Sequence, residues 1–188
     1  VHIARLSSAE GVSLVRVAKA EGLAVTCDVA AHHLHLSEVD LGWFDTQCRL
    51  EPPLRGTRDR AALRAGLADG TIDAVCSDHA PVDDDAKAVP FGEAEPGATG
   101  LELLLPLTLQ WATADKVPLA TALAVITVSP ARVLGVDAGH LAIGAAADGL
   151  IHTQRQGGLW GYMLEGNQVD FSNSQFALLG LNEAANAG

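Results

Sequence analysis

The segment 73-DAVCSDHAP-81 decides the fold class, because it places two chemically active side chains directly after a short apolar run. The composition of residues 73–77 predicts a strand that is buried on both faces of a parallel sheet. Parallel α/β folds carry their chemistry at the carboxyl ends of the strands, where Asp78 and His79 fall. Asp78 is therefore a candidate metal ligand or general base, although a turn-capping aspartate explains the same spacing equally well.

Two strand–helix units precede this segment. Short runs with β-branched residues predict strands at residues 1–6 and 23–29. Ser7 and Glu10 form a capping box that predicts a helix after the first strand, and Thr57 caps a second helix. Strands that alternate with helices indicate an α/β fold with parallel strands.

A long segment with three prolines, residues 79–98, follows the buried strand and is predicted to be a loop. Loops of this length inside a compact domain usually carry function. Helical patterns then occupy residues 99–113, 118–127 and 130–134.

The composition excludes several classes of partner. The formal net charge of −11 argues against nucleic acid or an anionic membrane, because both require a basic surface. The sequence has no uncharged apolar run of about 18 residues, so we expect no membrane span. The three cysteines have no CxxC spacing, and Cys27 and Cys76 lie in apolar runs. We therefore expect reduced thiols in a cytoplasmic protein.

Other candidate residues have competing interpretations. His32, His33 and His35 could bind metal, but adjacent histidines on extended backbone point apart, which favours a surface or hydrogen-bonding loop. The acidic run at residues 83–85 lacks calcium-loop spacing and is expected to be solvated.

Arg5 and Asp28 end neighbouring predicted strands, so we expect an ion pair between them; anion binding by Arg5 is the alternative. No glycine-rich loop follows a predicted strand in the required context, which disfavours a phosphate-binding module.

Seven blocks together resemble, in order and spacing, the C-terminal half of the class I dihydroorotases, which belong to the amidohydrolase superfamily. The blocks are VHIARLSSAEG (1–11), VTCDVAAHHLHL (25–36), EPPLR (51–55), DGTIDAVCSDHAP (69–81), PFGEAEPGATGLE (90–102), SPARVLG (129–135) and GHLAIGAAAD (139–148).

The resemblance implies the C-terminal part of a (β/α)8 barrel, with zinc at the carboxyl ends of the strands. It implies reversible ring closure of N-carbamoyl-L-aspartate to dihydroorotate, in pyrimidine biosynthesis. Asp78 matches the family aspartate that binds zinc and moves the proton, and Pro96-Gly97 matches a loop whose backbone contacts the substrate. Residues 1–135 would then be barrel, and residues 136–148 would enter a small β-sandwich domain.

Three positions depart from the family pattern. Arg5 stands where the family has a zinc-binding histidine, and a guanidinium has no lone pair to donate. Glu51 replaces a substrate-binding asparagine, and its carboxylate should repel the dihydroorotate anion. Val82 replaces a substrate-contacting histidine and has no polar atom.

These departures predict a degenerate, zinc-poor and non-catalytic member that acts as a scaffold for aspartate transcarbamoylase. The alternative is an active zinc-dependent amidohydrolase with altered ligands or a different small-molecule substrate, which the retained Asp78 and His79 favour.

After Asp148 the chain shows no sustained period of 2 or 3.6 residues, and residues 149–188 stay unassigned. A shifted reading frame or a junction with foreign sequence would explain this change, and the encoding DNA tests it.

Overall fold

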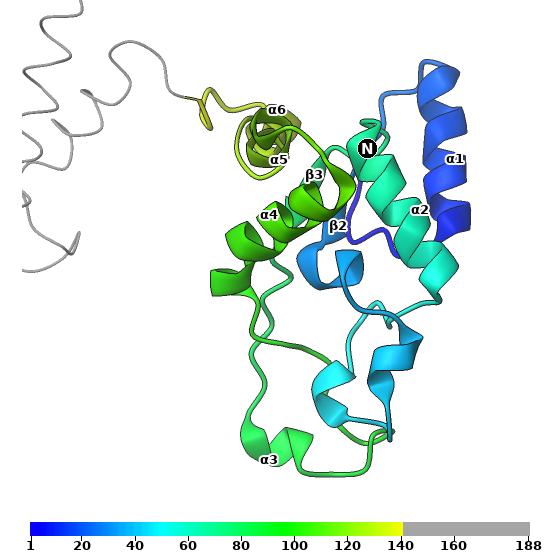
Figure 1. Cartoon of the computed structure of the whole chain (residues 1–188), viewed down its shortest axis with the longest axis vertical. Helices are drawn as coiled ribbons and strands as arrows, with labels where there is room; N and C mark the ends of the chain where they lie inside the picture. Colours follow the sequence, from blue (N-terminus) through cyan, green and yellow to red (C-terminus); the bar gives the residue numbers. More distant parts are fainter. Residues whose placement is uncertain (141–188) are drawn as a thin grey trace, which may run out of the picture. The chain divides into compact units, whose positions relative to one another are not determined.

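The computed structural model of the chain describes residues 1–140 (Figure 1). Residues Val1–Gly139 form one compact unit, and the second unit begins at His140. Most of the predicted β-sandwich segment and the whole of the unassigned tail lie outside the described residues.

Three parallel strands form the centre of the described unit, in the order β1-β2-β3. The strands are β1 (His2–Ile3), β2 (Thr26–Ala30) and β3 (Ala74–Cys76). Helix α1 (Ala9–Ala20) connects β1 to β2, and α2 (Thr57–Ala68) lies between β2 and β3. The prediction of an α/β fold with parallel strands is therefore confirmed.

The segments outside these units are helical or irregular. The α-helices are α3 (Asp84–Lys87), α4 (Leu104–Asp115), α5 (Leu119–Ala124) and α6 (Val128–Leu134). Short 3-10 helices are η1 (Ala31–Leu34), η2 (Glu38–Leu41), η3 (Thr46–Cys48) and η4 (Leu101–Leu103). Figure 1 shows α3 far from the other α-helices, at the tip of the long loop.

Two predicted helix caps are wrong by one residue. Ser8 precedes α1 with extended backbone, and its hydroxyl accepts a hydrogen bond from the amide of Gly11, whereas Ser7 is buried. Gly56 is the N-cap of α2, so Thr57 is already helical. Serine, threonine and glycine are all acceptable N-caps, so the sequence rule does not choose between two neighbouring candidates.

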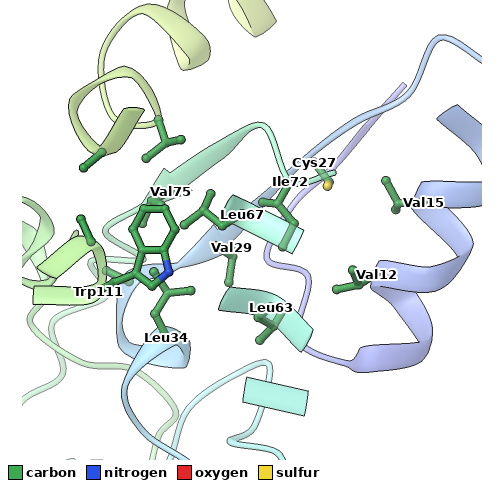
Figure 2. Close-up of a cluster of buried hydrophobic side chains, with 14 residues drawn as sticks. Val12, Val15, Cys27, Val29, Leu34, Leu63, Leu67, Ile72, Val75 and Trp111 are labelled. Carbon is green, nitrogen blue, oxygen red and sulfur yellow. The ribbon is translucent and has the colours of Figure 1, made fainter. Parts of the chain in front are cut away.

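The hydrophobic core lies between the sheet and the helices that pack on it. Trp111 of α4 lies at one end of the buried cluster, and Val12 and Val15 of α1 lie at the other (Figure 2). Within β2, Cys27 and Val29 are fully buried in this cluster. Each large apolar side chain buried in this way contributes about 1.5–3 kcal/mol to folding.

The opposite face of the sheet is polar, because side chains alternate along a strand. The His2 ring contacts the Thr26 hydroxyl at 2.9 Å and an Asp28 carboxylate oxygen at 2.8 Å. The Cys76 thiol donates to the other Asp28 oxygen at 3.3 Å. Asp28 therefore links all three strands on the face that leads to their carboxyl ends.

Candidate functional site at the carboxyl ends of the strands

Arg5 and Asp78 meet just beyond the ends of β1 and β3. Guanidinium Nη1 of Arg5 lies 3.4 Å from Oδ1 of Asp78, whose side chain is only 15% exposed. Both residues have left-handed backbone, with φ of 55° at Arg5 and 46° at Asp78. Such a conformation costs a non-glycine residue about 1 kcal/mol or more, so surrounding contacts must hold both strand ends.

Glu51 supplies the third partner, through its backbone rather than its side chain. The same Arg5 nitrogen donates to the Glu51 carbonyl at 2.7 Å, where the chain enters a cis peptide bond to Pro52. The Glu51 residue itself is exposed. Arg5 therefore joins three segments, and the shorter of its two contacts is the one to a neutral carbonyl.

The predicted ion pair between Arg5 and Asp28 is wrong. Asp28 accepts a hydrogen bond from the backbone amide of Arg5 at 2.8 Å, while its other oxygen faces His2. The left-handed turn at Arg5 aims the amide at Asp28 and the guanidinium at Asp78.

His32 is the imidazole nearest to Asp78, with Nε2 3.8 Å from Oδ2. This nitrogen is buried and makes no hydrogen bond. Burial, followed by the neighbouring His33, lowers the pKa of His32 to about 4, so the ring is neutral at pH 7. The predicted loop is the 3-10 helix η1, and this winding brings the His32 and His33 rings to 4.6 Å, where extended backbone would separate them.

The other two histidines of this segment bond to carbonyls, as the hydrogen-bonding interpretation predicted. His33 lies 3.3 Å from the Pro53 carbonyl, and His35 lies 2.8 Å from the Leu107 carbonyl. Burial lowers the pKa of both rings. They attach η1 to neighbouring segments, while His32 alone of the three faces Asp78.

Gly97 and Val82 lie against one another inside the long loop. A Cβ atom on Gly97 would come within 2.4 Å of the Ala80 carbonyl and 2.8 Å of a Val82 methyl group, and its φ of 147° also favours glycine. Gly97 is buried, and the adjacent Pro96 is exposed. Backbone close to residue 97 is thus packed too tightly for any larger residue.

Lys87 holds this loop in place, and sequence reasoning missed it. Its ammonium group is buried and donates to the carbonyls of Thr46, Arg49 and Gly97 at 3.1, 3.3 and 2.8 Å. Burial lowers the pKa of Lys87. The only feature of the sequence that points to Lys87 is its place as a cation after an acidic run. The prediction that this acidic run, residues 83–85, is exposed to solvent is confirmed.

His79, beside Asp78, has a structural contact. Its Nδ1 accepts hydrogen bonds from the amides of Gly100 and Leu101, at 3.2 and 3.3 Å. The ring thus fixes the start of η4, which leads directly into α4.

The described residues do not fit a zinc ion. Within residues 1–140, no group of three or more histidine, cysteine or carboxylate side chains is arranged to hold a metal. Asp78 and His32 could supply two metal ligands. The guanidinium of Arg5 also lies beside Asp78, and it cannot bind a cation. The thiol nearest this site, Cys76, is a hydrogen-bond donor to Asp28.

Comparison with known proteins identifies the family. The amidohydrolase family pattern matches residues 4–170, and the chain belongs to this family. It is 43% identical over 148 residues to a dihydroorotase of Geobacter sp. (strain M21), covering 79% of this chain and 35% of that protein. It is 44% identical over 147 residues to a dihydroorotase-like protein of Pseudomonas aeruginosa, covering 78% of this chain and 35% of the relative.

The fold agrees with solved structures. A D-hydantoinase from Thermus sp. aligns with a TM-score of 0.69 at 23% identity, over 75% of this chain and 33% of that one. The described unit is therefore part of an amidohydrolase (β/α)8 barrel, as predicted. The chain spans about a third of the length of the curated relatives that it matches.

The family match continues past residue 148, where the seven blocks end, and the origin of residues 149–188 stays a prediction.

None of the helices among residues 1–140 has the length and apolar character needed to cross a bilayer.

Proposed function

We propose that this chain is part of a dihydroorotase-family protein of pyrimidine biosynthesis that has lost zinc-dependent catalysis and serves as a scaffold for aspartate transcarbamoylase. The observation that carries the proposal is the contact of Arg5 with Asp78. The family metal ligand at position 5 is replaced by a permanent cation, which repels a divalent ion instead of binding it.

Two other positions support a loss of substrate chemistry. Glu51 is an exposed residue whose carbonyl contacts Arg5, and its carboxylate replaces the substrate-binding asparagine of a family whose substrate is an anion. Val82 packs on Gly97, so the loop keeps its shape while it lacks a hydrogen-bonding side chain there. All three departures alter the site, and none removes a residue of the hydrophobic cluster.

A scaffold role is consistent with described residues that keep the family fold while the candidate site departs from the family pattern. The relative in Pseudomonas aeruginosa is described as dihydroorotase-like rather than as dihydroorotase, which is consistent with this reading. A cytoplasmic location belongs to the same proposal, because Cys27, Cys48 and Cys76 are free thiols and such thiols are typical of a reducing compartment.

The second candidate is an active amidohydrolase with altered ligands or substrate. One observation favours it: His32 directs a buried nitrogen without a hydrogen bond toward Asp78. A neutral imidazole beside a carboxylate is a competent pair for proton transfer or metal binding.

The test is zinc stoichiometry by elemental analysis on the full-length protein, with a dihydroorotate hydrolysis assay on the same sample. We expect no stoichiometric zinc and no turnover. Sedimentation with aspartate transcarbamoylase from the same organism should then give a joint complex. One zinc or more per chain with turnover would reject the scaffold proposal and support the second candidate.

A further inference from the structure

We infer that the Arg5 guanidinium is a built-in cation that holds the carboxyl ends of the strands together, in the place where related proteins would use a metal ion. A metal ion at such a site has a catalytic role. It also has a structural role, because its ligands come from separate strands and the ion ties those strands together. Arg5 takes over the structural role alone. This inference shares one premise with the proposed function, that position 5 does not bind zinc, and is independent of any partner.

The contacts of Arg5 span the sequence in the way that metal ligation does. Its Nη1 reaches the Glu51 carbonyl at 2.7 Å and the Asp78 carboxylate at 3.4 Å, which are 46 and 73 residues away. Its backbone amide is held by Asp28 at 2.8 Å. One residue thus connects β1, the end of β3, and the loop that begins at Glu51.

The negative charge of Asp78 also requires a counterion. Asp78 is largely buried, and a buried carboxylate is costly unless a cation or several hydrogen bonds compensate it. A guanidinium is a permanent cation in proteins. Its attraction for Asp78 therefore needs no ion from solution.

The backbone supplies an independent observation. Arg5 and Asp78 are non-glycine residues with left-handed backbone, and they face one another from different strands. Each strained turn aims its side chain at the other residue. Strain of this kind persists only where contacts over-determine the conformation, and the Arg5 contacts provide them.

The test uses the full-length protein and its thermal midpoint, Tm, with and without EDTA. EDTA should leave the wild-type Tm unchanged. Arg5→Met should lower the Tm by about 2 °C or more, and Arg5→Lys should lower it less, because a lysine keeps the charge. Arg16→Met is the matched control: it removes an arginine from an ion pair with Asp69 whose two side chains are about half exposed.

A double-mutant cycle with Asp78→Asn separates the Arg5–Asp78 contact from a general effect of losing an arginine. The Tm loss of Arg5→Met/Asp78→Asn should be smaller than the sum of the two single losses. Additive losses, or an Arg5→Met loss no larger than that of Arg16→Met, would overturn the inference. Arg5→Gln replaces Arg5→Met in the cycle if Arg5→Met does not fold, and a wild-type Tm for Arg5→Gln would also overturn the inference.

The proposed function and the role of Arg5 as a built-in cation are rejected by different results. Zinc with turnover in the wild-type protein rejects the proposed loss of catalysis, even if the cycle shows coupling between Arg5 and Asp78. Additive losses in the cycle reject the built-in cation, even if the protein contains no zinc. A wild-type Tm that falls in EDTA also rejects it, because a bound ion would then hold the strand ends.

Discussion

The ammonium group of Lys87 donates a hydrogen bond of 2.8 Å to the carbonyl of Gly97, a position at which an added Cβ atom would clash with the Ala80 carbonyl. The same group also bonds to the carbonyls of Thr46 and Arg49, and the Lys87 carbonyl accepts from the Thr46 hydroxyl at 2.7 Å. Lys87 therefore attaches both sides of the loop to the segment that leads to Glu51.

Lys87→Met should lower the free energy of unfolding by about 2 kcal/mol or more, because it removes a buried ammonium group that donates to three carbonyls. Residues 79–98 should also exchange their amide hydrogens faster. Urea unfolding and hydrogen exchange of the full-length protein measure the two effects. Lys116→Met is the control, since Lys116 is exposed at the end of α4. Equal urea midpoints for the two variants would contradict the role given to Lys87.

His79→Ala should destabilise the protein by about 1 kcal/mol, the usual cost of losing a side chain that accepts from helix-start amides. His79→Asn should recover most of this loss, because a short amide oxygen also accepts from the Gly100 and Leu101 amides. Chemical denaturation of both variants measures the difference. If asparagine is no better than alanine, the ring contributes packing rather than hydrogen bonds.

Acid should destabilise the protein partly through His35. Burial, the largest cause, lowers the pKa of His35 below 6.5, so the folded chain resists a proton that the unfolded chain accepts. The stability from the neutral ring is present above pH 6.5 and is lost as the pH falls below it. His35→Gln keeps a donor for the Leu107 carbonyl and cannot titrate. Its unfolding free energy should fall less steeply between pH 7.5 and 5.5 than that of the wild type, and parallel profiles would refute this.

Alkylation should proceed at different rates at Cys27 and Cys48. Burial, together with the nearby Asp73 charge, raises the pKa of Cys27 to about 11 from 9.0, which lowers its thiolate fraction about 100-fold. Cys48 is less buried, although its pKa is also raised. Iodoacetamide at pH 8 followed by peptide mass spectrometry should label Cys48 well before Cys27. Early labelling of Cys27 in folded protein would mean that β2 opens.

The sequence was informative where local rules and family spacing act together. Strand and helix alternation predicted the parallel sheet, and the strand-end rule placed Arg5 and Asp78 at one edge. The pairing of Arg5 was predicted wrongly, because it depends on a positive φ that no sequence rule assigns to arginine. The role of Lys87 was not predicted for a different reason. Its hydrogen-bond acceptors are backbone carbonyls, which every residue has, so residue types do not reveal them.

The way in which Asp28 holds position 5 has a consequence for substitutions there. Asp28 binds the main-chain amide of Arg5, a group that every residue except proline possesses. This one contact is thus kept whichever other side chain is present at position 5, whereas the guanidinium contacts to Glu51 and Asp78 are not. A substitution at this position therefore changes the charge beside Asp78 and leaves the main-chain link between the first two strands in place.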